Sequence, residues 1–279
     1  MVHQKNLFLL KEAALILNPL GGKNLREAPL LFALAKHVGL EVKIVKDFWE
    51  IEQTIEKLVF SKRILLVSGG DGTISAVLTA CFRKKKVPAL AILPGGTTNL
   101  IAWDVSRPSG QLRSFQRFLK GFPPRIKKRK VLKIWPPNLY SMFCGAGLLA
   151  EGVKLYNKRR SQKGLRGLRN ALPVALQVLT KGLPSPKQWP RLKSYPRKIP
   201  IIMITTLERV FLPIQSFLKK PCPDIKVGIF ARTFIPFSVL CEKEIELETY
   251  TLAVDGELVE SKEGRFVIQS TEEIEFFSW

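Results

Sequence analysis

The sequence has few of the residues that build metal centres and covalent cross-links. Its 279 residues include two histidines, His3 and His37, and four cysteines. No cysteine lies within four residues of another, so the spacing of a zinc knuckle or a redox pair is absent. We expect four separate thiols in a reducing compartment. With so few histidines, a histidine-based triad or metal site is not expected, and acid–base chemistry must come from Asp, Glu or Lys.

Long apolar runs are also missing. No stretch reaches the roughly 18 apolar residues that suggest a spanning helix. Lys11 and Glu12 interrupt the apolar stretch near the N-terminus, which argues against a secretory signal. Hydrophobic residues make up 46% of the chain and charged residues 24%, as in a folded globular protein. We therefore expect a cytoplasmic protein of two ordinary domains.

Acidic residues are nearly absent from the middle of the chain. Residues 105–207 contain 23 basic residues and one acid, Glu151, which gives a net charge of +22. Residues 1–104 carry 14 basic and 9 acidic residues (+5), and residues 208–279 carry 8 basic and 13 acidic residues (−5), so these segments cancel. Such a concentration of charge indicates an anionic partner, either a membrane surface or a nucleic acid. A basic, solvated face is the alternative.

Short apolar segments alternate with amphipathic ones over the first hundred residues. Strands are expected at 13–17, 41–45, 64–67 and 89–93, and helices at about 26–38, 48–60, 73–82 and after the fourth strand. This alternation predicts a parallel sheet covered on both faces, in a three-layer α/β/α domain. After about residue 125, strand-like runs at 130–135, 139–144, 199–206, 225–231, 244–254 and 265–269 predict a mainly antiparallel second domain. A helical excursion, 148–183, interrupts it.

Two glycine-rich loops follow predicted strands and precede predicted helices. In the first, Gly69-Gly70-Asp71-Gly72-Thr73, the glycines let backbone N–H groups approach an anion, and the helix N-terminus adds its positive end. Asp71 is negative, and a carboxylate among phosphates points to handling of a Mg²⁺–nucleotide. An ordinary Asp-Gly turn is the alternative.

The second loop, Pro94-Gly95-Gly96-Thr97-Thr98-Asn99, repeats this design and adds hydrogen-bonding side chains at Thr97 and Asn99. Asn18-Pro19, with Gly21 and Gly22, follows the first predicted strand in the same way. The carboxyl ends of parallel strands meet at one edge of a sheet, so we expect the three loops to converge. No Walker-type sequence occurs, which disfavours a P-loop NTPase.

These motifs resemble the diacylglycerol kinase catalytic-domain family, which includes bacterial lipid kinases, ceramide kinases and sphingosine kinases. The resemblance covers nearly the whole chain. It rests on five motifs in this order: Asn18-Pro19 with Gly21, Gly69–Thr73, Pro94–Asn99, Gly145-Ala146-Gly147 and Val254–Glu257.

The resemblance implies a nucleotide-binding domain at 1–125, a β-sandwich lipid domain at 126–261, and a chain tail, about 262–279, that returns to the first domain. ATP and Mg²⁺ would bind between the domains. Asp71 would be essential and would meet the metal through Mg–ATP, and Glu257 matches the family's proposed base. Which of these two carboxylates accepts the proton stays open. The remaining residues that would line or support the nucleotide site are Asn18, Gly69, Gly70, Gly72, Thr73, Gly96, Thr97 and Asn99.

Three positions limit what is carried over. From the residues alone, Asp255-Gly256-Glu257 is equally a hairpin turn with exposed carboxylates. Leu100 stands where the family often has Asp. Asp224 is all that remains of an acidic cluster that binds a structural Mg²⁺ in bacterial members.

The sequence therefore predicts an ATP-dependent lipid kinase, associated peripherally with a membrane through its basic residues 105–207. Its acceptor would be a hydroxyl of a membrane lipid such as diacylglycerol or a sphingoid base. We expect the excursion 148–183 to dock on the anionic bilayer. One alternative is an NAD kinase-like enzyme with a soluble substrate. Another is an inactive relative that binds membrane or nucleic acid, although the aromatic-plus-glycine signatures of RNA readers are missing.

Overall fold

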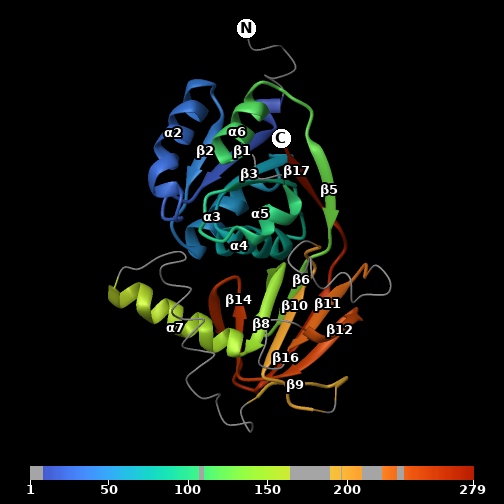
Figure 1. Cartoon of the computed structure of the whole chain (residues 1–279). Helices are drawn as coiled ribbons and strands as arrows, with labels where there is room; N and C mark the ends of the chain where they lie inside the picture. The colour runs from blue at the N-terminus through green and yellow to red at the C-terminus, as the bar shows by residue number, and fades with distance from the viewer. Residues whose placement is uncertain (1–8, 107–109, 164–188, 196, 209–221, 231–235) are drawn as a thin grey trace. The chain divides into compact units, whose positions relative to one another are not determined.

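The structure is a computed structural model that describes residues 9–106, 110–163, 189–195, 197–208, 222–230 and 236–279. Its residues form two compact units (Figure 1). Unit 1 comprises Met1–Arg129 and Glu273–Trp279, and unit 2 comprises Lys130–Glu272. Residues 164–183 of the expected helical excursion lie outside the described residues. None of the described helices is both long enough and apolar enough to cross a membrane.

Unit 1 is a six-stranded sheet with helices on both faces, in the order β2-β1-β3-β4-β17-β5. Its strands are β1 (Ala13–Leu17), β2 (Glu41–Ile44), β3 (Ile64–Gly69), β4 (Ala89–Pro94), β5 (Arg125–Arg129) and β17 (Ile274–Ser278). Its helices are α2 (Asn24–His37), α3 (Phe48–Leu58), α4 (Asp71–Arg83), α5 (Leu100–Val105) and α6 (Gln111–Leu119). The neighbouring strands are parallel except β5, which runs antiparallel to β17.

Burial on both faces explains why β1 is apolar throughout and β3 is apolar from Ile64 to Val67. Every residue of β1 and of β3 is buried. Helices α2 and α6 cover one face, where Leu31 and Phe115 join a core with Leu15 and Leu66 of the strands. Helices α3, α4 and α5 cover the other face (Figure 1). Parallel strands buried on both sides need such continuous apolar runs.

Unit 2 is an antiparallel β-sandwich. One sheet has the order β12-β11-β10-β8-β14-β15 and the other β7-β6-β16-β13-β9. The strands are β6 (Leu132–Trp135), β7 (Leu139–Ser141), β8 (Phe143–Gly147), β9 (Arg191–Leu192), β10 (Ile201–Thr205), β11 (Ile225–Phe230), β12 (Pro236–Glu242), β13 (Glu244–Glu248), β14 (Thr251–Val254), β15 (Glu257–Glu260) and β16 (Arg265–Ser270). Helix α7 (Leu148–Lys163) follows β8 directly. The predicted fold class is confirmed: a parallel-sheet α/β domain and antiparallel sheets in the C-terminal part.

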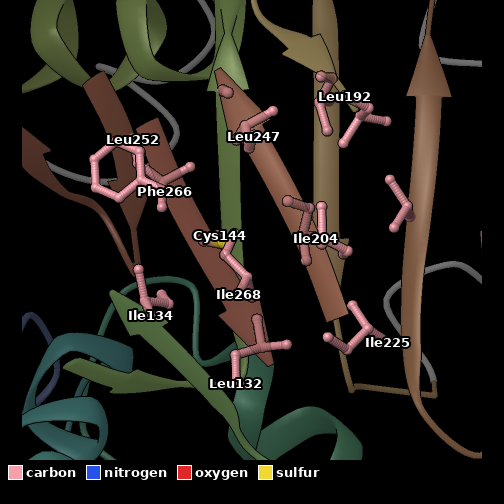
Figure 2. Close-up of a cluster of buried hydrophobic side chains, with 14 of the residues drawn as sticks. Leu132, Ile134, Cys144, Leu192, Ile204, Ile225, Leu247, Leu252, Phe266 and Ile268 are labelled. Atoms are coloured by element: carbon pink, nitrogen blue, oxygen red, sulfur yellow. The ribbon is translucent and has the colours of Figure 1, made fainter. Parts of the chain in front are cut away.

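The core of unit 2 is formed by side chains from both of its sheets (Figure 2). Cys144, Ile204 and Leu252 come from one sheet, and Phe266 and Ile268 come from the other. Alternate residues of each strand point inward, which explains why the core positions recur with a period of two.

The chain passes between the units at Arg129–Lys130 and at Glu272–Glu273. The sequence prediction placed these passages at about residues 125 and 262. The first passage comes later because β5 pairs with β17 of unit 1. The second comes later because β16 pairs with β13 and β6 of unit 2.

Several elements were not predicted from the sequence. Strand β5 reads Arg-Ile-Lys-Lys-Arg, and four cations in five residues hide the strand pattern. It lies at the sheet edge, where charged side chains reach solvent. The pattern also missed β9, β12, β17 and α6.

A disulfide joins Cys222 and Cys241, whose Cα atoms lie 5.7 Å apart. Cys222 precedes β11, and Cys241 lies on β12, opposite Lys226 of β11. The expectation of four separate thiols is therefore wrong for this pair, because proximity across an antiparallel hairpin leaves no short spacing in the sequence. Cys81 and Cys144 are free and buried, and burial raises the pKa of the Cys81 thiol to about 12.

We predict that replacing both Cys222 and Cys241 by Ser lowers the free energy of unfolding in oxidising buffer. The disulfide closes a loop with a sequence separation of 19 residues. Loop-closure entropy for a loop of this size corresponds to about 3 kcal/mol. Chemical denaturation measures the difference, and a reducing agent should bring the wild type and the variant together. Two free thiols at these positions in the mass spectrum of the unreduced protein would contradict the prediction.

Candidate functional site

Three loops of unit 1 meet at the carboxyl edge of its parallel strands. Asn18 follows β1, Gly70 follows β3, and Gly95 follows β4, and these three strands are adjacent in the sheet. Backbone hydrogen bonds join the loops: the Asn18 N–H donates to the Ser68 carbonyl (2.9 Å), and the Lys23 N–H donates to the Gly95 carbonyl (2.9 Å). The convergence predicted from the strand order is present in unit 1.

The two glycine loops pack backbone against backbone. A Cβ added at Gly96 would lie 2.4 Å from the Cα of Gly70, closer than real Cβ contacts come. A Cβ at Gly95 would lie 2.4 Å from the side-chain oxygen of Asn24. These glycines are therefore needed for the close approach of the loops to each other and to Asn24.

Asp71 links the two glycine loops through its carboxylate. The residue is buried at the start of α4, and its oxygens accept three hydrogen bonds from the segment after β4. One oxygen accepts from the Thr98 hydroxyl (2.9 Å) and the Leu100 N–H (3.0 Å), and the other accepts from the Ile101 N–H (3.0 Å). The carboxylate thus satisfies the first N–H groups of α5. About four acceptor positions exist on a carboxylate, so roughly one is left for another donor or a metal.

Asn99 shapes the second loop from within. Its backbone is left-handed (φ 53°), and its side chain is buried against Gly96. The side-chain oxygen accepts from the Gly96 N–H (2.8 Å), and the amide nitrogen donates to the Gly96 carbonyl (2.9 Å). Both polar atoms of the Asn99 side-chain amide are therefore hydrogen-bonded to the backbone of Gly96 in the same loop.

Asn18 and Thr73, both predicted from the sequence, contact each other. The Asn18 amide donates to the Thr73 hydroxyl (3.0 Å), while its oxygen accepts from the Leu20 N–H (3.0 Å). Gly72 and Thr97 are exposed beside them, and Gly70 is half-buried. The exposed part of the two glycine loops therefore consists of Gly72 and the two threonines Thr97 and Thr98, and exposed glycine backbone suits close approach of an anion.

A closed triangle of buried polar side chains lies beside the loops and was missed in the sequence. The Asn24 amide donates to the Ser68 hydroxyl (2.9 Å), Ser68 donates to the Gln111 oxygen (3.0 Å), and the Gln111 amide donates to the Asn24 oxygen (2.8 Å). Asn24 also donates to the Asn18 carbonyl (2.7 Å). The triangle ties the starts of α2 and α6 to the end of β3. Three polar residues so far apart in the chain leave no motif.

In unit 2, Asp255 and Gly256 form the two-residue turn between β14 and β15, and both have positive φ (48° and 89°). The Ser141 hydroxyl donates to the Asp255 carboxylate, and the Asn157 amide donates to the Gly256 carbonyl (3.1 Å). Glu257 follows at the start of β15 and is exposed. Asp-Gly suits a tight hairpin, so the turn is fixed on one side by β7 and on the other by α7.

The Asp255 carboxylate also acts on the buried thiol of Cys144. Burial first, and then the negative charge of Asp255, raise the pKa of that thiol well above its ordinary value. The thiol therefore stays protonated and is a poor nucleophile.

Asp224, which the sequence analysis singled out, forms an ion pair with Lys130. Lys130 donates to its carboxylate (2.5 Å), and the Ser270 hydroxyl donates to the same oxygen (3.2 Å). The hydrogen bond from Lys130 holds the pKa of Asp224 below its usual value. Within the described ranges, no group of three or more His, Cys, Asp or Glu side chains is placed to hold a metal ion.

We predict that Asp71→Asn destabilises unit 1 by about 1–3 kcal/mol. The Asn amide has one acceptor oxygen, so its NH₂ group would face either the Ile101 N–H or the Thr98 and Leu100 donors. Asp47→Asn is the matched control, because Asp47 caps α3 by accepting one N–H, from Glu50, and Asn caps equally well. Equal unfolding midpoints for the two variants would show that the Asp71 contacts carry no stability.

We predict that Gln111→Leu lowers the free energy of unfolding by a similar amount, about 1–3 kcal/mol. Asn24 and Ser68 would stay buried, and each would lose its hydrogen bond to Gln111. Gln116→Leu, on the exposed side of the same helix, should change the free energy of unfolding by less than about 0.5 kcal/mol. Urea unfolding of both variants makes the comparison. A Gln111 variant as stable as the Gln116 variant would exclude a stabilising role for the triangle.

Comparison with known proteins identifies relatives of the N-terminal part of the chain. Residues 12–128 match the family model of the diacylglycerol kinase catalytic domain. A diacylglycerol kinase of Staphylococcus carnosus is 27% identical over 121 residues, which cover 42% of this chain and 40% of that protein. One from Staphylococcus epidermidis is 28% identical over 124 residues and 38% of its length. The chain thus matches about two fifths of the length of these relatives.

Solved structures extend the similarity to the whole fold. A diacylglycerol kinase of Bacillus anthracis has a TM-score of 0.64 and 17% sequence identity, over 96% of this chain and 97% of that one. Another crystal structure from the same organism has a TM-score of 0.68 over 96% of this chain and 95% of that one. At this identity, the likeness shows that both units have the same fold as those proteins.

Proposed function

Since residues 12–128 match the family model of the diacylglycerol kinase catalytic domain, we propose that the chain is an ATP-dependent lipid kinase. It transfers the γ-phosphoryl group of ATP to a hydroxyl of a membrane lipid such as diacylglycerol or a sphingoid base. The observation that carries the proposal is the pair of glycine loops that Asp71 joins at the carboxyl edge of the sheet. This arrangement leaves glycine backbone exposed where phosphates of a nucleotide would bind.

The residues of unit 1 fit a nucleotide triphosphate. Gly70 and Gly72 let the triphosphate approach the backbone closely, Thr97 supplies a hydroxyl, and Asn99 and Thr73 hold the loop shapes. Asp71 offers one remaining acceptor position, and Mg²⁺ commonly takes only one or two carboxylates together with phosphates and water. Mg²⁺ would supply neutralisation of the phosphate charge.

Glu257 is the proposed base. As the lipid oxygen forms its bond to the γ-phosphorus, the hydroxyl proton passes to the Glu257 carboxylate, and the bond from that phosphorus to the bridging oxygen breaks to release ADP. The exposure of Glu257 and the fixed Asp255-Gly256 turn support this role. Asp71 is then a positioning residue, because its contacts hold the loops.

A lipid acceptor requires contact with a bilayer, so the proposal includes peripheral membrane association of a cytoplasmic enzyme. Diacylglycerol, a sphingoid base, ceramide, phosphatidylglycerol and an isoprenoid glycerol all offer a suitable hydroxyl. An enzyme acting on the soluble substrate NAD is the second candidate, because it would share the Gly-Gly-Asp-Gly-Thr loop.

Incubation of the purified chain with labelled ATP and total membrane lipid tests the proposal, with mass identification of the labelled product. We expect a phosphorylated lipid and no labelled product from NAD. Label in NAD alone would support the second candidate. No transfer to either acceptor would overturn the proposed kinase activity.

The role of Glu257 is tested by a matched pair of variants. Glu257→Gln should lower kcat by roughly 10²–10⁴-fold, the usual contribution of a general base. Glu260→Gln, at the other end of β15 and also exposed, should leave kcat nearly unchanged. Unaltered turnover in the Glu257 variant would assign the proton to another group.

A further inference from the structure

A basic and apolar surface lies on the α6 side of unit 1, at the edge of the sheet. We call it the α6–β5 face, and it consists of Arg113, Gln116, Arg117, Lys120, Phe122, Ile126 and Lys128. Helix α6 buries Ser114, Phe115 and Phe118, so its other side presents Arg113, Gln116 and Arg117 to solvent. Gln116 and Arg117 lie three and four residues after Arg113 and therefore share one side of the helix with it.

The strand that follows extends this surface in a known direction. Ile126 lies opposite Phe277 and Lys128 lies opposite Glu275 in the β5–β17 pair. Phe277 packs with the core on the α2 and α6 side. Because directly paired residues project from the same face of a sheet, Ile126 and Lys128 lie on the α6 side.

The segment is strongly cationic and lacks acids. Residues 110–129 contain seven basic residues and no Asp or Glu. Two of the seven, Lys127 and Arg129, contact Asp104 of α5. Within the described part of the chain, Arg113 and Lys120 form no ion pair, and Lys128 is 3.9 Å from Glu275. The α6–β5 face therefore carries uncompensated positive charge.

The cations surround a hollow with an aromatic wall. The hollow measures about 300 Å³ and is lined by Arg113, Gln116, Arg117, Lys120 and Phe122. The Arg117 guanidinium lies over the Phe122 ring, 5.0 Å from its centroid. A phosphate group entering the hollow would meet three cations and one amide.

Two apolar side chains project from the same surface. Phe122 is 46% exposed and Ile126 is 54% exposed. The turn that carries Phe122 is held in place, because its carbonyl accepts from the Trp279 indole N–H (2.5 Å) and its N–H donates to the Arg117 carbonyl (3.1 Å). A fixed, exposed aromatic ring among cations is the pattern of a membrane-interface anchor.

The opposite side of the sheet gives an internal contrast. There, Phe60 is 63% exposed and Lys86 lies 5.3 Å from its centroid, much as Arg117 does at Phe122. The neighbouring cations Arg83 and Lys84 are paired with Glu52 and Glu56. An exposed aromatic ring therefore occurs on both sides. Near Phe60 two of the neighbouring cations are paired with acids, whereas Arg113, Arg117 and Lys120 near Phe122 form no ion pair with any described residue.

We infer that the α6–β5 face docks on an anionic lipid bilayer, with Phe122 and Ile126 entering the interface and the cations meeting lipid phosphates. The purpose of this docking rests on the proposed lipid kinase function, since the acceptor lies in a membrane. A nucleic acid would be attracted by the same charge, but the two exposed apolar side chains, Phe122 and Ile126, favour a bilayer. This surface is formed by residues 113–128 of unit 1, which are not part of the excursion 148–183 that the sequence pattern indicated.

Vesicle sedimentation of the full chain tests the charge. The vesicles contain phosphatidylcholine with phosphatidic acid, and no ATP is added. The variant Arg113→Glu, Arg117→Glu, Lys120→Glu should bind roughly 100-fold more weakly than the wild type, since each cation near an anionic surface contributes several-fold. The control Lys57→Glu, Lys85→Glu, Lys86→Glu makes the same charge change on the α3–α4 side and should bind within about threefold of the wild type. Equal loss in both triple variants would overturn the inference.

A second pair of variants tests the apolar contact without changing charge. Phe122→Ser should weaken binding roughly tenfold, as expected when an aromatic ring no longer enters the interface. Phe60→Ser is the control and should bind like the wild type. Unfolding midpoints report whether each variant is folded, and a folded Phe122 variant with wild-type binding would exclude insertion of this ring.

The outcomes separate docking from catalysis. Vesicle binding through this face without phosphoryl transfer would overturn the proposed function and leave the docking surface standing. Transfer to a dispersed short-chain lipid by a chain that does not bind the vesicles would overturn the docking surface alone. Preference for an oligonucleotide over the vesicles, abolished by the Arg113, Arg117, Lys120 reversal, would assign the face to nucleic acid instead.

Discussion

The carboxylate of Asp71 sets the relation between the two glycine loops of unit 1. Asp71 begins α4 after β3, whereas its three donors belong to the segment after β4. The Asp71 carboxylate is buried, and leaving it without hydrogen bonds would cost free energy, so the three donors are held close to it. The two helices that leave the sheet at these strands therefore start from one shared point. The same two loops approach each other closely at Gly70 and Gly96.

The polar side chains of the site mainly shape the loops. Asn99 closes its own loop on Gly96, Asn18 holds Thr73, and the Asn24–Ser68–Gln111 triangle braces the loops from beneath. Backbone groups are then left to face a ligand. Loops arranged in advance lose little conformational freedom on binding, which favours affinity for a charged and heavily hydrated group.

The order of elements and the convergence of the loops could be predicted because they follow from local patterns: apolar strand runs, glycines after them, and parallel pairing. The Gln111 triangle and the Cys222–Cys241 disulfide could not, because each depends on residues brought together only by the tertiary fold. Strand β5 was missed for a different reason. Its side chains are exposed to solvent or contact Asp104, and none of them is buried in a core, so the strand has no apolar pattern. The role of Asp71 was only partly visible, since the sequence shows a carboxylate among glycines but not its donors.

The place of β17 in the sheet bears on how the protein is made. It lies between β4 and β5, yet it is synthesised after every strand of unit 2. During synthesis on the ribosome, unit 2 can complete both of its sheets before β17 is made. Until then β4 has an unpaired edge, and β5 lacks the strand with which it pairs in the described sheet. Open edges are templates for pairing with other chains. The nascent protein is therefore most exposed to aggregation in its first-made half, and removal of a few residues around Phe276 would prolong that vulnerable state indefinitely.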